Sequence, residues 1–205
     1  MRYLTTADIE KLEAKANAIR QSTIESLTIA KSGHTAGPLG MADIFTLLYF
    51  HVLRHDPANP DWPERDRVVL SNGHICPGYY ATLAHAGYFP VDELQTLRKL
   101  GTRLQGHPHR TTLPGIETSS GPLGSGLSQA VGMALAERID NPYSAKFFFC
   151  LASDGELEEG NTWEAALLAG KEQLHNLIMI IDRNGIQIDG FTKDVMPLEP
   201  LREKF

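Results

Sequence analysis

The chain has few cysteines, no long apolar run and no excess of basic residues. Only Cys76 and Cys150 are cysteines among 205 residues, which excludes a disulfide-rich secreted scaffold. No apolar run reaches the length of a membrane span, so no membrane contact is expected. Lys and Arg number 19 against 25 Asp and Glu, and without a basic cluster this argues against binding nucleic acid.

Other features that the sequence lacks indicate how the chain is divided into domains and in which compartment the protein is expected. The first residues, Met1 to Thr5, lack the apolar core of a secretion signal, so we expect a reduced, cytoplasmic protein. There is no internal repeat, low-complexity segment or linker, and we therefore expect one domain over residues 1–205. With 42% hydrophobic and 21% charged residues, the composition is that of an ordinary globular protein.

Two polar turns, each after an apolar run, are the most informative feature. The run 147–152 leads into Ser153-Asp154-Gly155, and the run 177–181 leads into Asp182-Arg183-Asn184-Gly185. A helical pattern at 162–171 lies between them, which predicts a strand–helix–strand unit with a right-handed crossover. Asp154 and Asn184 would then lie at the carboxyl ends of parallel strands, where open α/β sheets bind ligands.

The residue types in these turns suit a hard cation. Asn184 follows Asp154 by 30 residues, and we interpret the Asp154 carboxylate, the Asn184 amide oxygen and the Ile186 carbonyl as ligands of Mg²⁺ or Ca²⁺. A bound diphosphate would supply two more oxygens, and water the sixth. The alternative is two ordinary turns, because Asp-Gly and Asn-Gly are common turn pairs.

The remaining pattern predicts an α/β fold: a doubly wound, mostly parallel sheet flanked by helices. Apolar spacing and capping residues predict helices at 5–31, 41–54, 77–85 and 91–100, a short strand at 68–70, and a helix beginning near 126. The segment 32–40, with three glycines and a proline, is expected to be an irregular loop.

Three histidines lie in such loops. They are His34 after Gly33, His74 after the strand at 68–70, and His107, which Pro108 holds on extended backbone. For His34 alone, a surface histidine without a task is the alternative. Zinc binding by the three is not favoured, because their separation has no zinc-type spacing. A glycine-rich loop at 118–126 precedes a helix and suits an anion, although it is not a Walker loop.

Taken together, these motifs resemble the thiamine-diphosphate enzymes, and among them the transketolase family. The fingerprint of a Gly-Asp-Gly followed after about thirty residues by Asn appears here as Ser153-Asp154-Gly155 and Asn184, with serine for the first glycine. Further family-like segments occur in the same order along nearly the whole chain: 32–34, 65–74, 106–108, 121–124 and 182–190. The whole looks most like the separate N-terminal subunit of a split transketolase, a thiamine-diphosphate-binding (PP) module.

The resemblance implies roles for individual residues. Asp154, Asn184 and the Ile186 carbonyl would hold the cation. The residues expected to contact thiamine diphosphate are His74, Gly121, Pro122, Leu123 and Gly155, together with Asn184 through the metal. His34 and His107 would face substrate hydroxyl groups and assist proton transfer. Glu159 matches a buried family glutamate that couples active sites across a subunit interface, and Thr35 stands where the family usually has proline.

The resemblance also implies a reaction and a partner. The family moves a two-carbon ketol unit from a ketose phosphate to an aldose phosphate, in the pentose phosphate pathway. The glutamate that activates the cofactor belongs to the next domain, so we expect a hetero-oligomer with a separate subunit carrying the Pyr and C-terminal domains. Because the chain ends at Phe205, we expect a C-terminally shortened module that is catalytically silent alone.

Two other readings stay open. One is a shortened, non-catalytic relative that acts as an assembly partner, suggested by Ser153 and the early end. The other keeps thiamine chemistry but changes the reaction, as in a 1-deoxyxylulose-5-phosphate synthase-like protein or the α chain of a ketoacid dehydrogenase. The set of three histidines favours transketolase over the second of these alternatives.

Overall fold

The computed structural model describes residues 3–188 and 190–205, so Met1, Arg2 and Asp189 lie outside the described part. The chain forms two compact units and passes between them three times. Unit 1 comprises residues up to 65 together with 74–116, and unit 2 comprises 66–73 together with 117–205. The expectation of one domain over residues 1–205 stays a prediction, and each unit is described separately.

Unit 2 is built on a parallel sheet of three strands in the order β1-β2-β3. The strands are β1 (Arg67–Leu70), β2 (Phe148–Ser153) and β3 (Leu177–Asp182). Leu70 pairs with Leu151, and at the carboxyl edge Ser153 pairs with Asp182. The three predicted strands and their parallel arrangement are thus confirmed, with ends that differ by a residue.

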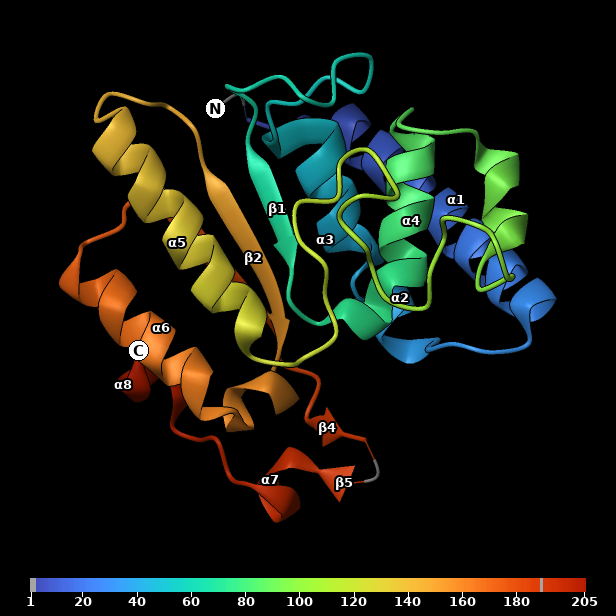
Figure 1. Ribbon diagram of the computed structural model, residues 1–205. Helices are drawn as coiled ribbons and strands as arrows, with labels where there is room; N and C mark the ends of the chain where they lie inside the picture. The colour runs from blue at the N-terminus through green and yellow to red at the C-terminus, as the bar shows by residue number, and fades with distance from the viewer. Residues whose placement is uncertain (1–2, 189) are drawn as a thin grey trace. The chain divides into compact units, whose positions relative to one another are not determined.

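Two long helices pack together along this sheet. They are α5 (Ser125–Asp140) and α6 (Gly160–Lys171), which lie side by side in Figure 1. The buried faces of α5, α6 and the strands share one apolar core of Val69, Leu127, Ala130, Val131, Ala134, Phe148, Cys150, Ala165 and Leu174. Because α6 connects β2 to β3, the predicted strand–helix–strand unit is confirmed.

Short elements complete unit 2. A 3₁₀ turn, η4 (Gly155–Glu158), joins β2 to α6. After β3 come a small antiparallel pair, β4 (Ile186–Gln187) and β5 (Gly190–Phe191), and the short helices α7 (Thr192–Val195) and α8 (Leu201–Lys204). This hairpin was not predicted from the sequence, because two-residue strands are too short to show an alternating pattern.

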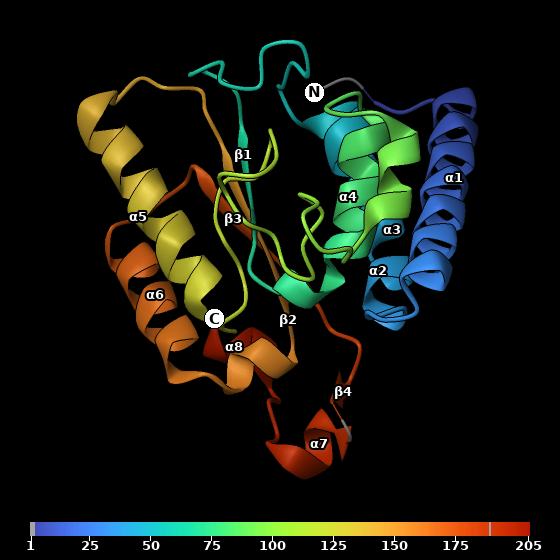
Figure 2. The same cartoon turned by 45° about the vertical axis from the view of Figure 1, so that its right-hand side comes forward.

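Unit 1 is helical and begins with α1 (Thr6–Ala30). Thr5 and Asp8 form a reciprocal capping box at its start, which satisfies two N–H groups that a helix end leaves free. The elements α2 (Ala36–Gly40), α3 (Ala42–Leu47) and α4 (Cys76–His85) follow, with a π-helix η1 (Leu48–Val52) and 3₁₀ turns η2 (Gly73–Ile75) and η3 (Val91–Thr96). Figure 2 shows α1, α3 and α4 together.

Two predictions for unit 1 were wrong in part. The expected helix at 91–100 is a 3₁₀ turn that ends at Thr96, because Leu97 has a non-helical ψ of 127° and Arg98 has a φ of 59°. The expected irregular loop at 32–40 becomes helical at Ala36, because Pro38 falls in the first turn, where its missing N–H costs nothing. In the described ranges, no helix is both long enough and apolar enough to cross a bilayer.

Candidate cofactor site and histidine cluster

The first candidate site in unit 2 is the buried carboxylate of Asp154, directly after β2. Its exposed fraction is 0%. Oδ1 accepts a hydrogen bond from the main-chain N–H of Gly155 at 3.0 Å, and Oδ2 accepts one from the N–H of Gly185 at 2.7 Å. The parallel register of β2 and β3 continues into the turns, since the N–H of Asp154 donates to the carbonyl of Asp182 at 3.1 Å. The two predicted turns are therefore adjacent and directly bonded.

The second turn is shaped by the side chain of Asn184. Its Oδ1 accepts from the N–H of Ile186 at 2.9 Å, and its Nδ2 donates to Oδ2 of Asp182 at 3.2 Å. Such a local Asx hydrogen bond fixes the turn, and Gly185 has a φ of 78° that glycine adopts without strain.

The residues at these turns fit a divalent cation by the chemistry of their donors. A carboxylate, an amide oxygen and the Ile186 carbonyl form an all-oxygen set, and the oxygens of Asp154 and Asn184 keep lone pairs beyond the hydrogen bonds described. A guanidinium nitrogen of Arg183 lies 3.4 Å from Oδ2 of Asp154 and places positive charge at this carboxylate. No cluster of three or more His, Cys, Asp or Glu side chains suited to a metal occurs in residues 3–188 and 190–205.

The predicted glycine loop lies at the start of α5. Gly121, Pro122 and Leu123 precede Gly124, whose φ is 78°. Contacts here leave no room for side chains: a Cβ on Gly124 would lie 2.3 Å from Oδ1 of Asn161. By contrast, a Cβ on Gly121 would meet no atom within 4 Å, so this end of the loop is open for a ligand to approach.

Glu156 is a residue of this site that the sequence analysis missed. Its side chain is 1% exposed, and it accepts hydrogen bonds from the Ser71 hydroxyl and from the N–H groups of Gly124 and Ser153. Burial raises the pKa of Glu156, and these three hydrogen bonds oppose the rise. No signal in the sequence separates Glu156 from the other acidic residues of the same turn.

The other two glutamates of this turn are differently placed. Glu159 is exposed in this chain, so its expected role at a subunit interface stays a prediction. Glu158 is half-buried, and its Oε1 has no hydrogen-bond partner within the described residues. Burial and the nearby charges of Asp154 and Glu159 raise the pKa of Glu158. The turn therefore concentrates negative charge beside the Asp154 carboxylate.

Unit 1 brings the three predicted histidines together. The ring centroids of His34 and His74 are 5.0 Å apart. Burial lowers the pKa of His74 to about 4, with further contributions from His34 and His107. Burial, His34 and Arg98 likewise lower the pKa of His107. His74 and His107 are therefore neutral at pH 7, and a neutral imidazole can both donate and accept a hydrogen bond.

The loop that carries His107 is fastened to α4. The Cys76 thiol lies 3.2 Å from the Gly106 carbonyl, and the Tyr80 hydroxyl donates to the Gln105 carbonyl at 2.9 Å. His74 lies in η2, which runs directly into α4, so the same helix holds the segments of two of the three histidines in place. The Cys76 thiol is inert as a nucleophile, since burial raises its pKa to about 12.

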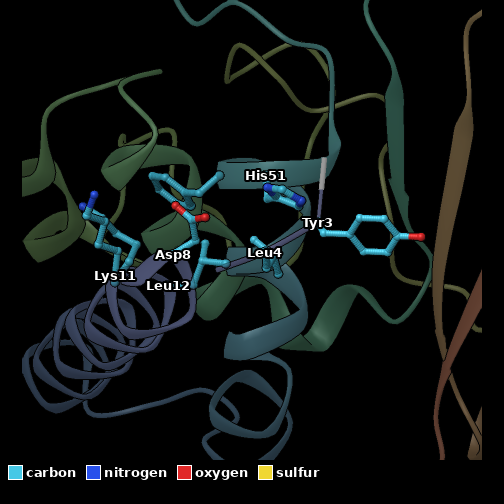
Figure 3. A pocket seen from close by; sticks show the side chains of 8 residues that line it. Tyr3, Leu4, Asp8, Lys11, Leu12 and His51 are labelled. Atoms are coloured by element: carbon cyan, nitrogen blue, oxygen red, sulfur yellow. The ribbon is translucent and has the colours of Figure 1, made fainter. Parts of the chain in front are cut away.

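The cavity shown in Figure 3 lies elsewhere in unit 1, at the start of α1 and beside η1. It measures about 280 Å³, and Leu4, Lys11, Leu12 and His51 are among its lining residues. None of the predicted site residues lines it. A shallow hollow in unit 2, about 500 Å³, is lined by Leu157, Glu158, Trp163, Met196, Pro197, Leu198 and Lys204.

The fold and the two adjoining turns of unit 2 define a class of protein: an α/β module that binds a charged cofactor at the carboxyl edge of a parallel sheet. The family model described as "Transketolase, thiamine diphosphate binding domain" matches residues 11–205. The chain therefore belongs to the transketolase family, as its thiamine-diphosphate-binding N-terminal domain, and is part of a transketolase-type transferase.

Individual relatives agree with this assignment. The chain is 45% identical to a 6-deoxy-6-sulfo-D-fructose transketolase subunit of a Clostridium species, over 95% of this chain and 70% of the relative. It is 44% identical to an apulose-4-phosphate transketolase subunit of Actinobacillus succinogenes, over 96% of this chain and 71% of the relative. It is 43% identical to transketolase 2 of Escherichia coli, but spans only 28% of that protein.

Solved structures show the same relationship. Transketolase from Leishmania mexicana matches with a TM-score of 0.88 and 40% identity, over 94% of this chain and 30% of the solved one. Transketolase from Campylobacter jejuni matches with a TM-score of 0.88 and 37% identity, over 95% and 31%. The α/β fold class and the resemblance to the N-terminal subunit of a split transketolase are confirmed.

Proposed function

We propose that this chain supplies the diphosphate-binding half of a ketol-transfer active site. In this proposal Asp154, Asn184 and the Ile186 carbonyl hold Mg²⁺, and through it the diphosphate of thiamine diphosphate. The observation that carries it is the hydrogen bond from Gly185 to Asp154, because it brings the tips of the two fingerprint turns together. An all-oxygen donor set at this point suits Mg²⁺, which usually shares its coordination sphere with phosphate oxygens.

Other residues of the chain would bind and orient the cofactor. The proposal assigns the diphosphate to the loop of Gly121, Pro122 and Leu123, to Gly155 and to His74. The loop lies at the start of the long helix α5, whose dipole favours an anion there, and Gly121 leaves its near end open to a ligand. When bound, the thiazolium ring of thiamine diphosphate supplies the electron sink for ketol transfer.

The proposed role of His34 and His107 is proton transfer at the hydroxyl groups of the sugar. The lowered pKa of His107 keeps its imidazole neutral at pH 7, so that it can accept a proton from a hydroxyl group. The proposal of a sugar substrate is supported by this cluster, since carbonyl and hydroxyl groups of a sugar offer matching donors and acceptors.

The proposal includes a partner and a substrate class. Two relatives of which the chain spans about 70% are named as transketolase subunits. We infer that a separate subunit with the Pyr and C-terminal domains completes the site, in a cytoplasmic hetero-oligomer, and that the substrates are sugar phosphates or similar sugars. Assignment to the pentose phosphate pathway is part of the same proposal. Glu159, exposed in this chain, would contribute to the subunit contact.

Calorimetry with thiamine diphosphate and Mg²⁺ tests the binding half of the proposal. Micromolar binding that disappears with EDTA supports it, whereas no binding at millimolar cofactor favours the non-catalytic assembly partner. A ketol-transfer assay with xylulose 5-phosphate and ribose 5-phosphate tests the rest. Activity is expected only after the partner subunit is added, and transfer by this chain alone would contradict the proposed division of the site.

A further inference from the structure

Glu156 connects three segments of unit 2 that are far apart in the sequence. Its Oε1 accepts from the Ser71 hydroxyl, which follows β1, and from the N–H of Gly124 at 2.8 Å. Its Oε2 accepts from the N–H of Ser153, the last residue of β2, at 3.2 Å. With an exposed fraction of 1%, this carboxylate is withdrawn from solvent, so these partners replace water.

The network extends one step further into α5. The Ser71 hydroxyl, which donates to Glu156, also accepts from the N–H of Gly126 at 3.0 Å. Glu156 thereby satisfies, directly or through Ser71, two N–H groups at the start of α5 that have no partner within the helix.

Two of the three bonded segments are next to residues of the proposed cofactor site. Gly124 directly follows Leu123 of the glycine loop, and Ser153 directly precedes Asp154. A Cβ on Gly124 would lie 2.8 Å from the Cβ of Glu159, so the loop is already pressed against the turn that follows β2. The carboxylate of Glu156 is therefore bonded both to the residue after the loop 121–123 and to the residue before Asp154.

We propose that Glu156 is a positioning residue, which holds the loop 121–123 and the Asp154 turn in the geometry that receives a metal diphosphate. This inference rests on the proposed function. It assigns no contact between Glu156 and the cofactor. A carboxylate suits this position because its two oxygens meet three donors, whereas the NH₂ group of glutamine would face an N–H donor on either side.

Amide hydrogen exchange of the cofactor-free chain tests whether Glu156 holds the N–H groups of Gly124 and Ser153. In Glu156→Gln, exchange at Gly124 and Ser153 is expected to accelerate at least about tenfold, while amides inside α5 such as Ala134 keep their rates. The matched control is Glu164→Gln, an exposed glutamate of α6. Unchanged exchange at Gly124 and Ser153 would show that Glu156 does not hold these two segments, and the inference would be wrong.

Cofactor affinity tests the positioning role. The dissociation constant for thiamine diphosphate with Mg²⁺ is expected to rise on the order of tenfold to a hundredfold in Glu156→Gln, as when a supporting partner of a metal site is lost. Glu156→Asp, which keeps the carboxylate, is expected to bind more tightly than Glu156→Gln. If only the length of the side chain mattered, Glu156→Gln would bind the cofactor at least as tightly as Glu156→Asp. An equal or larger loss of affinity in Glu156→Asp would therefore count against the positioning role.

Two outcomes separate this inference from the proposed function. If the wild-type chain binds no thiamine diphosphate at millimolar concentration, the proposed function fails, and the positioning role fails with it. If the wild type binds and Glu156→Gln binds equally well, the positioning role alone is wrong. Should Glu156→Gln not fold, Ser71→Ala removes one of the three bonds, and a smaller rise in the same dissociation constant is expected.

Discussion

The main-chain N–H of Gly185 donates a 2.7 Å hydrogen bond to Oδ2 of Asp154. This bond joins residues that are 31 apart in the sequence, and it exists because β2 and β3 are parallel neighbours paired from Phe148–Leu177 to Ser153–Asp182. A carboxylate that is buried without water depends on such donors. The same carboxylate that is proposed to bind the metal therefore also stabilises the turn at Gly185.

The first prediction concerns this carboxylate. Asp154→Asn keeps the size of the side chain but removes its charge, and one of its two polar atoms becomes a donor that faces N–H groups. We expect the affinity for Mg²⁺ to fall by roughly a hundredfold or more, and the free energy of unfolding to fall by about 1–3 kcal/mol. Calorimetry and urea denaturation measure the two effects.

The control for this variant is Asp140→Asn, which makes the same change at an exposed carboxylate at the end of α5. It is expected to bind Mg²⁺ as the wild type does. If Asp154→Asn also retained wild-type affinity for the metal, the cation would have to be held elsewhere and the proposed site would be wrong.

Two glycines of α5 give a second prediction, on stability. A Cβ at Gly126 would lie 2.3 Å from the Cβ of Ser71, so Gly126→Ala forces the helix away from the turn after β1 and is expected to destabilise by about 1–3 kcal/mol. Gly132 has no atom within 4 Å of such a Cβ. Gly132→Ala should therefore stabilise by about 0.5–1 kcal/mol, because alanine favours the helix.

Urea unfolding of the two variants decides between steric conflict and helix propensity. The two substitutions are chemically identical and lie in one helix, so only their surroundings differ. Equal shifts of the unfolding midpoint in both variants would mean that the close contact of Gly126 with Ser71 does not exist in solution.

The strand–helix–strand unit with its two polar turns could be predicted from the sequence because its signals lie in one continuous stretch of the chain. Apolar runs followed by Asp154-Gly155 and Asn184-Gly185, with a helical period between them, are sufficient to define a crossover unit. The structure confirms the adjoining turns, and it also brings together His34, His74 and His107, which lie in three separate loops. For the histidines, proximity followed from the family resemblance and from no spacing rule.

Other features could not be predicted, for physical reasons. Glu156 is buried, yet it lies in a run of acidic residues, and which glutamate faces inward depends on donors from Ser71 and Gly124, far away in the sequence. The segment after Thr96 has helical spacing, but Arg98 takes a positive φ to pair its N–H with the Leu104 carbonyl. In both cases tertiary partners decide, and a pattern of residue types carries no information about them.

The third prediction follows from the lowered pKa of His74, about 4 in the folded chain against an ordinary value of 6.5. The unfolded state binds a proton more readily, so its stabilisation grows as the pH falls below 6.5 and levels off below about 4. The folded state thus loses stability in this window, by about 1–2 kcal/mol once partial exposure of the ring is taken into account.

Urea unfolding at pH 7 and pH 4.5 measures this loss for the wild type and for His74→Gln, in which the histidine contribution should be absent. His109→Gln, an exposed histidine of the same unit, is the matched control. A pH dependence that is the same in His74→Gln as in the wild type would show that the His74 ring titrates alike in the folded and unfolded states.

The last prediction concerns the two thiols, which are fully buried. Burial raises the pKa of Cys76 to about 12, and burial together with the charge of Glu156 also raises that of Cys150. Only the thiolate attacks a disulfide reagent, and at pH 8 a pKa of about 12 leaves roughly one thiol in ten thousand ionised. We therefore expect no reaction of the native chain with Ellman's reagent within minutes, and two reactive thiols after denaturation.

The control is Ser128→Cys, at an exposed position of α5, which should add one thiol that reacts at once in the native state. Rapid native reaction of Cys76 would mean that α4 opens readily from the loop of His107.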